Sequence, residues 1–387
     1  MTRILQVATL PLTMRLFVMP LAEALAERGY QVELAYGGSE PWQPAPFVGY
    51  HLPLRRSPFH PGNASALWEL TQLMRARRYE VVHVHTPVAG ALGRLAARAA
   101  GVPVVAYTMH GSFWGTHPRW RAALFDVLER RSAQWTSHVF VFNDEDAGDL
   151  RHRCHIAPER LTRLPVGGAG VDLERFDPNR FPPETVSKLR EELGLCELDT
   201  VVGYVGRIDR DKGVSKLLRA VAQLRQEYPR LRLLLVGGRT AGDRDALTGA
   251  LLAELGTAAV GTGFSNDVPA LMACMDLVVS PSYRDGFGMV LAEAAAMQKP
   301  VVATATRGSR SAVVDGVTGL LTPIGDVAAL ALAIERLISD AATRAQMGRA
   351  ARQLAVERFD RRTVMSIYQA AYTGLLNNGI PRARRDH

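Results

Sequence analysis

Two acidic residues stand eight positions apart in the segment SPSYRDGFGMVLAEAAA, Ser280 to Ala296. Asp285 precedes a Gly-Phe-Gly turn, and Glu293 lies about two turns into the helical pattern that follows. Gly286 and Gly288 remove side chains where a ligand could approach backbone amides closely. The carboxylates could accept hydrogen bonds from hydroxyls, Glu293 from a ribose and Asp285 from another sugar. Taken alone, the segment favours a simpler interpretation, acidic residues that stabilise a helix N-terminus.

Two basic residues follow an earlier apolar run in VGYVGRIDRDKGVSKLLRAV. We expect a strand over 201–205 that ends at Gly206, with Arg207 and Lys212 between this strand and a helix. A helix N-terminus favours anions, arginine can bind a phosphate through two parallel donors, and lysine acts as a compact charge. The segment alone supports about equally a diphosphate clamp and two solvent-exposed cations in a loop.

Apolar, β-branched runs alternate with helical patterns along the chain and predict the elements that carry these residues. Runs that are apolar on both faces are typical of central parallel strands covered by helices. They are ILQVATL, YQVELAY, EVVHVHT, VPVVAYT, HVFVFN, TVVGYVGRI, RLRLLLVGG, AAVGTGF, DLVVSPS, PVVATAT and TGLLTPI. Helical segments such as MPLAEALAERG lie between them and end at Gly or Pro. This order predicts an α/β protein.

The alternation breaks once, between about Gly167 and Thr200, in a segment rich in Gly, Pro and charge. We therefore predict an N-terminal domain over 1–170 and a C-terminal domain over 171–360. Each is expected to be a Rossmann-like, doubly wound parallel sheet, and the two are expected to face each other across a cleft. The segment 361–387 predicts an amphipathic helix that crosses back to the first domain.

The composition narrows the class of protein. At 387 residues, 47% hydrophobic and 22% charged, the chain is globular and long enough for two domains. No apolar run approaches the roughly 20 residues that span a bilayer, and the first residues predict a strand rather than a signal peptide. Three separated cysteines suit a reducing cytoplasm. The net charge of +8 suits an anionic membrane or phosphorylated small molecules better than nucleic acid, or it has no functional meaning.

Together, VGRIDRDKG and PSYRDGFGMVLAEAAA, about seventy residues apart, resemble the retaining glycosyltransferases of family 4, which have the GT-B fold. The resemblance implies that Arg207 and Lys212 hold the diphosphate of a nucleotide sugar and that Glu293 binds its ribose. Asp285 stands where the family usually has Glu, and it would contact the donor sugar with a carboxylate one methylene shorter. The same resemblance implies phosphate-binding backbone amides around Gly286, Phe287, Gly288 and Met289.

The N-terminal half is similar to the same family in its H-x-H-T-P and T-x-H-G motifs. His83 and His85 share one face of a strand, where we expect them to satisfy buried polar groups, since no further zinc ligands lie nearby. His110 follows another strand. The resemblance implies that it is the residue nearest the transferring sugar, and the alternative is a hydrogen-bonded loop histidine.

The sequence departs from the family pattern in two places. The loop after the first strand, ATLPLTMRL, lacks the usual Gly-Gly, and Ala169 replaces the Asn of N-G-V-D. The segment 111–125, rich in Trp and Arg, predicts a lipid-headgroup or sugar-stacking surface, or else a packed helix start. Candidate acceptor-binding residues are therefore Met14, Arg15, His85 and Trp114.

Two D-x-D triplets, at 209–211 and 243–245, raise the possibility of a manganese site as in another glycosyltransferase fold. Three-residue motifs recur by chance, and the first triplet lies inside the proposed phosphate loop. Because Arg207 and Lys212 can neutralise a diphosphate, we expect no metal and no other cofactor.

The resemblance implies a retaining enzyme that moves a hexose or N-acetylhexosamine from a nucleoside diphosphate sugar, with UDP as the expected nucleotide. Its family reacts by front-face substitution, in which the leaving phosphate takes the acceptor proton. The acceptor, held by the N-terminal domain, is expected to be lipid-linked or a polysaccharide precursor, and the enzyme to be cytoplasmic, peripheral on the inner face of the membrane. The alternatives are a soluble small-molecule acceptor, a UDP-sugar epimerase of the same shape, and a binding protein without activity.

Overall fold

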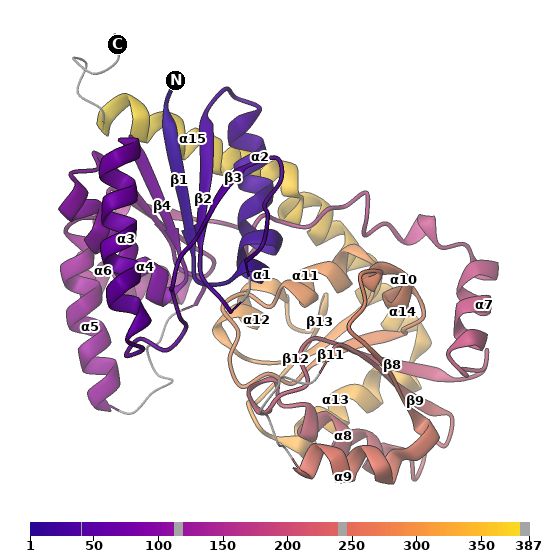
Figure 1. Cartoon of the computed structure of the whole chain (residues 1–387). Helices are drawn as coiled ribbons and strands as arrows, with labels where there is room; N and C mark the ends of the chain where they lie inside the picture. Colours follow the sequence, from indigo (N-terminus) through magenta and orange to yellow (C-terminus); the bar gives the residue numbers. More distant parts are fainter. Residues whose placement is uncertain (40, 112–118, 239–245, 380–387) are drawn as a thin grey trace. The chain divides into compact units, whose positions relative to one another are not determined.

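The computed structural model describes residues 1–39, 41–111, 119–238 and 246–379 (Figure 1). Contacts divide the chain into two compact units. Unit 1 comprises Met1–Gly170 together with the segment from Arg362 onward, and unit 2 comprises Val171–Arg361. Among the described residues, no helix combines the length and the apolar character that crossing a bilayer requires.

Unit 1 is built on a parallel sheet with the strand order β3-β2-β1-β4-β5-β6-β7. Its strands are β1 (Arg3–Ala8), β2 (Gln31–Tyr36), β3 (Val48–His51), β4 (Val81–His85), β5 (Val104–Thr108), β6 (His138–Val141) and β7 (Leu161–Arg163). Its helices are α1 (Pro11–Thr13), the π-helical turn η1 (Met14–Val18), α2 (Met19–Ala26), α3 (Gly62–Arg77), α4 (Pro87–Ala100), α5 (Arg119–Ala133), α6 (Asp144–Cys154), the 3-10 turn η2 (Pro158–Arg160) and α15 (Arg361–Gly379).

Unit 2 has a second parallel sheet with the order β10-β9-β8-β11-β12-β13. Its strands are β8 (Thr200–Val205), β9 (Leu231–Val236), β10 (Ala259–Gly263), β11 (Leu277–Ser280), β12 (Val301–Thr304) and β13 (Gly319–Thr322). Its helices are α7 (Pro183–Glu192), α8 (Val214–Leu224), α9 (Ala246–Leu255), α10 (Val268–Ala273), α11 (Met289–Ala296), α12 (Arg307–Ala312), α13 (Val327–Ser339) and α14 (Ala341–Leu354). Short 3-10 or π-helical turns are η3 (Pro178–Arg180), η4 (Arg210–Lys212), η5 (Gly256–Ala258) and η6 (Ala355–Phe359).

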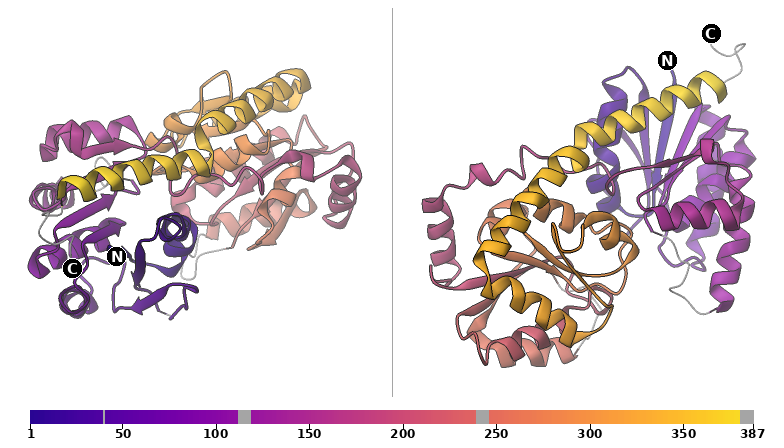
Figure 2. Two further views of the ribbon diagram at one scale, coloured as in Figure 1. Left: turned by 90° about the horizontal axis from the view of Figure 1, so that it is seen from above. Right: turned by 180° about the vertical axis from the view of Figure 1, so that it is seen from behind.

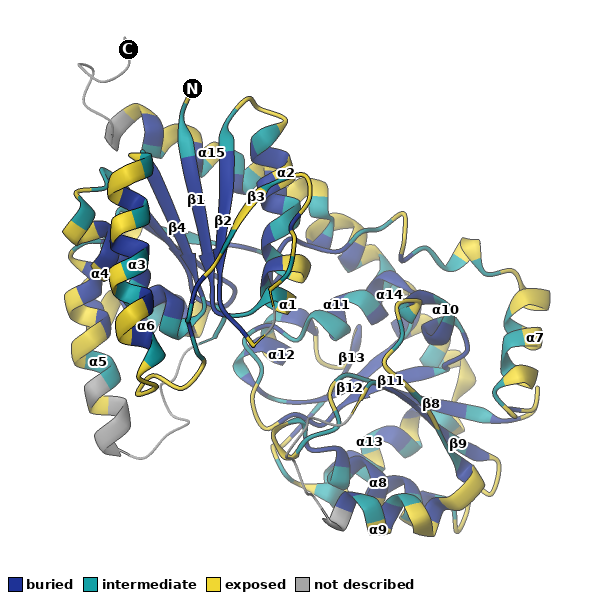
Figure 3. Cartoon of the chain, viewed as in Figure 1, coloured by how far each residue is buried: buried dark blue, intermediate teal, exposed yellow. Residues whose placement is uncertain are grey.

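Every apolar run that predicted a strand is a strand, and the predicted α/β class is confirmed. The sequence did not reveal β3 and β7, which are short strands at the two edges of the sheet of unit 1. β3 is largely exposed and β7 half-buried, whereas the central strands are dark blue, that is buried, in Figure 3. An edge strand needs only one hydrogen-bonded neighbour and partial cover, so it can form without a continuous apolar run.

The two faces of the unit 1 sheet are covered by different helices. Val82 and Val84 of β4 belong to the core cluster that α3 and α4 complete. Alternate residues point to the other face, where the C-terminal helix α15 crosses the strands (Figure 2). His83 and His85 therefore face α15.

Candidate active site

Two turns of unit 2 meet where the strand order reverses. β8 is the first strand of its sheet, with β9 on one side and β11 on the other, so the carboxyl ends of β8 and β11 form a topological switch point. The N–H of Tyr283 donates to the carbonyl of Asp211 across this point, at 3.0 Å. Gly213 lies so close to the other turn that a Cβ there would stand 2.1 Å from the carbonyl oxygen of Pro281. The turns after Gly206 and Pro281 thus converge.

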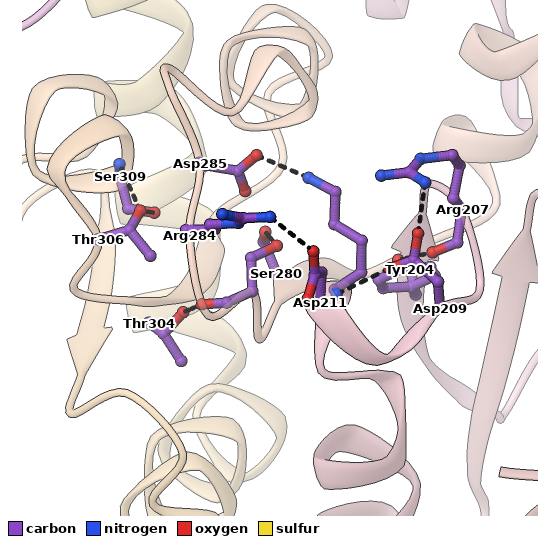
Figure 4. Close-up of polar contacts among 12 residues, drawn as sticks. Tyr204, Arg207, Asp209, Asp211, Ser280, Arg284, Asp285, Thr304, Thr306 and Ser309 are labelled. Carbon is purple, nitrogen blue, oxygen red and sulfur yellow. Dashed lines mark hydrogen bonds and ion pairs between the residues drawn. The ribbon is translucent and has the colours of Figure 1, made fainter. Parts of the chain in front are cut away.

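An ion pair joins the two turns. Lys212 Nζ donates to Asp285 Oδ1 at 2.6 Å, and the two side chains are 26% and 11% exposed (Figure 4). The second carboxylate oxygen, Asp285 Oδ2, is buried and has no hydrogen-bond partner in the part of the chain that the structure describes. Because a buried acceptor without a partner is costly, Oδ2 is ready to accept a hydroxyl from a bound ligand.

The turn after β8 orients the guanidinium of Arg207. Its Nη1 lies 2.6 Å from Asp209 Oδ2, and its carbonyl accepts the hydroxyl of Tyr204 at 2.6 Å (Figure 4). Asp209 also accepts the backbone N–H of Lys212 at 3.0 Å, which caps the 3-10 turn η4. At the outer edge, Arg284 pairs with the exposed Asp211 at 2.9 Å. Carboxylates therefore hold the cations at the strand ends.

The glycine-rich turn presents backbone rather than side chains. Gly288 precedes α11 with φ 58°, a conformation that favours glycine, and Met289 is the first helical residue. Phe287 is buried and packs edge-on against Phe359, with ring centroids 5.9 Å apart. The first N–H groups of a helix have no partner within the helix, so this turn can offer donors to an anion.

A third turn, after β12, supports the glycine-rich one and was not anticipated from the sequence. The N–H of Gly308 donates to the carbonyl of Asp285 at 3.2 Å, and a Cβ at Gly308 would stand 2.7 Å from that oxygen and from the Phe287 backbone. Thr304 donates its hydroxyl to the carbonyl of Ser282 (Figure 4). The sequence signal for this turn is the Arg-Gly-Ser segment at 307–309. Its contact with the glycine-rich turn could not be predicted, because it depends on β12 lying beside β11.

Glu293 lies on α11 and is partly buried. Burial raises the pKa of its carboxyl to about 7, and the positive charge of Arg175 acts in the opposite direction. The carboxyl is therefore half-ionised near neutral pH. A ligand hydroxyl that hydrogen-bonds the carboxylate would favour the ionised form.

His110 follows β5 in unit 1, and aromatic rings surround it. The centroids of Phe17, from η1, and Phe142, after β6, lie 5.6 Å and 5.4 Å from that of the imidazole. Burial lowers the pKa of His110 to about 4, so the ring is neutral at pH 7. The sequence did not indicate either phenylalanine, because both lie far from His110 along the chain.

His83 and His85 lie side by side on β4, with ring centroids 4.2 Å apart. Both are buried and hydrogen-bonded, His83 to Tyr372 and Thr108 and His85 to Gln6 and His110. The expectation that they satisfy buried polar groups is confirmed. Both ring nitrogens of His85 are bonded within unit 1, and its contact with an acceptor stays a prediction.

The remaining candidates of unit 1 differ from one another. Met14 is fully buried, so its side chain is a core residue and not an open contact for an acceptor. Arg15 is exposed. Trp114 lies outside the described residues, together with the rest of 112–118.

The D-x-D triplets give no metal site in the described ranges. Asp209 pairs with Arg207 and Asp211 with Arg284. Asp243 and Asp245 lie outside the described residues. Within them, no cluster of three or more His, Cys, Asp or Glu side chains could hold a metal ion.

Comparison with known proteins identifies the class to which these folds and motifs belong. The model of the family described as "Glycosyl transferases group 1" matches residues 186–354, and that of the "Glycosyl transferase 4-like domain" matches residues 13–167. EpsD of Bacillus subtilis (strain 168), which carries the name of a glycosyltransferase, is 33% identical over 370 residues and 94% of each chain. The chain belongs to this glycosyltransferase family, and the resemblance to family 4 is confirmed.

Other relatives carry more specific names. A D-inositol 3-phosphate glycosyltransferase of Salinispora arenicola (strain CNS-205) is 34% identical over 76% of this chain and 68% of its own. The capsular polysaccharide biosynthesis glycosyltransferase CapM of Staphylococcus aureus is 25% identical over 85% of this chain and 86% of its own.

Solved structures show the same fold. Sucrose-phosphate synthase from Thermosynechococcus elongatus matches 97% of this chain and 100% of its own with a TM-score of 0.82 and 24% identity. HepE of Anabaena, in complex with UDP-glucose, matches 97% of this chain and 100% of its own with a TM-score of 0.78 and 23% identity. The two parallel-sheet units are therefore those of a GT-B protein, as predicted.

Proposed function

We propose that this glycosyltransferase is a retaining enzyme that moves a hexose or N-acetylhexosamine from a UDP-sugar to a lipid-linked or polysaccharide-precursor acceptor. The ion pair between Lys212 and Asp285 carries the proposal. It joins a cation suited to a diphosphate with a carboxylate that has one oxygen still available for a sugar hydroxyl. A nucleotide sugar carries both a diphosphate and sugar hydroxyls in one molecule.

The donor is held by unit 2 in this proposal. Arg207 and Lys212 bind the diphosphate, together with the amides of the glycine-rich turn from Gly286 to Met289. Glu293 accepts hydrogen bonds from the ribose hydroxyls, and Asp285 accepts one from the transferred sugar. His110, in unit 1, bonds a hydroxyl of the substrate as a neutral imidazole.

The proposed chemistry is front-face substitution. The bond between the anomeric carbon and the phosphate oxygen breaks while the acceptor oxygen attacks from the same face, and the acceptor proton passes to the leaving phosphate. Negative charge grows on the diphosphate as this bond breaks, and cations placed beforehand stabilise it. Arg207 and Lys212 can supply that stabilisation without a metal ion.

The nucleotide and the acceptor class are supported by likeness. The related structure of HepE contains UDP-glucose, and the name of the relative CapM assigns it to capsular polysaccharide synthesis. The net charge of +8 suits anionic membrane lipids, where a lipid-linked acceptor would be found. We therefore place the enzyme at the cytoplasmic face of the membrane.

The test is a panel of UDP-, GDP- and dTDP-sugars incubated with the purified enzyme and a bacterial lipid extract. We expect sugar to move into the lipid fraction from a UDP-sugar, and NMR of the product to show the anomeric configuration of the donor. The matched control is Arg207→Ala, which should transfer nothing measurable.

Other outcomes would overturn parts of the proposal. An inverted product would exclude retention. Transfer to soluble small molecules but not to lipid would move the acceptor to the alternative class. Epimerised donor formed without any acceptor would indicate an epimerase, and no turnover of any donor would contradict the proposal as a whole.

A further inference from the structure

A chain of hydrogen bonds within unit 1 links the C-terminal helix α15 to His110. Tyr372 of α15 accepts the side-chain N–H of Gln6 at 3.1 Å, and Gln6 Oε1 lies 2.8 Å from His85 Nε2. His85 Nδ1 lies 3.3 Å from His110 Nε2. The chain thus joins residues from β1, β4, the loop after β5 and α15.

With the Gln6 amide oriented as in the structure, the atoms in this chain determine which nitrogen of each imidazole carries the proton. Gln6 Oε1 can only accept, so His85 Nε2 must donate and carries the hydrogen. Burial lowers the pKa of His85 well below its usual value, so the ring is neutral and its Nδ1 must accept. His110 Nε2 therefore donates, and its Nδ1 keeps a lone pair. The assignment follows from the orientation of the Gln6 amide.

A side branch is compatible with this assignment. Tyr372 accepts from Gln6 and has one hydrogen, which it donates to His83 Nδ1 at 2.7 Å. His83 is also neutral, because burial lowers its pKa, and its Nε2 donates to the Thr108 hydroxyl at 2.7 Å. All of these bonds can be formed at once with one proton on each ring.

Packing alone does not require so many polar groups at this place. His83, Gln6 and Tyr372 are fully buried, and His85 is 1% exposed. Burying hydroxyls, amides and imidazoles is costly unless every group is bonded, and a Phe on α15 would pack as well as a Tyr. Among the histidines of this network, His110 is the most exposed. The polar residues contribute more than packing, because their hydrogen bonds define which ring nitrogen of His110 carries the proton.

We propose that Tyr372 is a positioning residue that, through Gln6 and His85, holds His110 as the Nε2–H tautomer, so that Nδ1 accepts a hydrogen bond from a substrate hydroxyl. The tautomer stands independently of the function proposed above, whereas the contact with a hydroxyl rests on it. Within the described ranges, the imidazole of His110 makes one hydrogen bond, through Nε2 to His85.

The tautomer can be read directly from the ligand-free, full-length enzyme. ¹⁵N NMR with labelled histidine distinguishes the protonated from the unprotonated ring nitrogen, and His110→Asn identifies the signals of residue 110. We expect Nε2–H in the wild type and a mixture of tautomers in Tyr372→Phe and Gln6→Leu. The matched control is Tyr368→Phe, one turn away on α15 and also buried, whose hydroxyl lies 3.4 Å from Thr108. It should keep the wild-type tautomer.

Kinetics then tests the contact with the substrate. In Tyr372→Phe we expect kcat to fall roughly ten-fold while KM for the donor changes less, and Tyr368→Phe to stay near wild type. An Nδ1–H tautomer in the wild type would overturn the proposal even if neither variant folds, and so would an unchanged tautomer in Gln6→Leu. An altered tautomer with unchanged kcat would remove the role of Nδ1 but leave the assignment of donor and family intact.

Discussion

The Nζ of Lys212 lies 2.6 Å from Oδ1 of Asp285, and these residues are 73 positions apart in the chain. The ion pair spans the switch point between β8 and β11. It leaves Oδ2 of the same carboxylate buried and without a partner among the residues described. One side chain can therefore position a phosphate-binding cation and accept a hydroxyl at the same time.

Asp285→Asn should separate the two roles of Asp285, positioning Lys212 and accepting a sugar hydroxyl. The amide keeps the shape of the side chain but removes its charge, so we expect sugar transfer to fall on the order of a hundred-fold. UDP lacks the transferred sugar that Asp285 contacts, and in this variant Lys212 no longer has a competing carboxylate, so UDP binding should be unchanged or tighter. Calorimetry with UDP and kcat/KM with the UDP-sugar measure the two effects.

The matched control for this substitution is Asp211→Asn. It removes the exposed ion pair with Arg284, and such pairs contribute little. Two results would contradict the role given to Asp285. One is a rate of sugar transfer in Asp285→Asn equal to that of the wild type, and the other is an equally large loss of transfer in Asp211→Asn.

Lys212→Ala and Arg207→Ala should each weaken UDP binding by roughly ten- to a hundred-fold, since each removes a charge-assisted hydrogen bond to phosphate. Transfer should become undetectable. Because Arg207 is 49% and Lys212 26% exposed, the fold should survive both changes, which circular dichroism and thermal unfolding would show. Lys188→Ala, an exposed lysine of α7, is the control. Sugar transfer retained in Arg207→Ala or in Lys212→Ala would count against the proposal that these residues bind the diphosphate.

Glu293 should make both stability and donor binding depend on pH. Its folded-state pKa of about 7 lies above the usual value of 4.5, so the folded protein holds a proton that the unfolded chain has released. The free energy of unfolding should therefore fall as pH rises from the unfolded-state pKa of 4.5 through the folded-state pKa of about 7. We expect the fall to be about 2–3 kcal/mol relative to Glu293→Gln. Urea unfolding of both proteins at pH 5 and pH 8 measures the difference.

Donor affinity should change in the opposite direction. The ionised carboxylate is the better acceptor for ribose hydroxyls, so a UDP-sugar should bind more tightly to the wild type as pH rises through 7. The UDP-sugar diphosphate does not itself ionise in this range. In Glu293→Gln the affinity should be nearly independent of pH, and a pH dependence equal to that of the wild type would exclude Glu293 as its source.

Gly213→Ala should damage the site through geometry alone. Gly213 has φ 67°, and its new methyl group would stand 2.1 Å from the carbonyl oxygen of Pro281, so the two turns must move apart. Gly263→Ala is the control, because Gly263 has φ 70° but open space around it. Both variants should lose roughly 1 kcal/mol of stability from the strained backbone, and only Gly213→Ala should also lose donor binding. Equal donor binding in the two would show that the closeness of the turns is not needed.

Much of the fold could be predicted from local sequence. Central strands such as β5 and β11 are largely apolar runs because helices cover both faces of a parallel sheet. The edge strands β3 and β7 have no such pattern, since solvent reaches them. The turn residues Arg207, Lys212 and Asp285 were evident from their positions after strands, but their partners were not.

The amino-acid sequence by itself determined the α/β class and the turns that carry the polar residues, because these depend on periodicity and short-range spacing, and two of its motifs resembled those of a glycosyltransferase family. Only the tertiary structure decided that Asp285 pairs with Lys212 and that Tyr372 reaches Gln6, 366 positions away. The physical reason is that strand order and the return of α15 bring distant segments together. Their side chains then satisfy one another's buried polar groups, and no local pattern encodes that match.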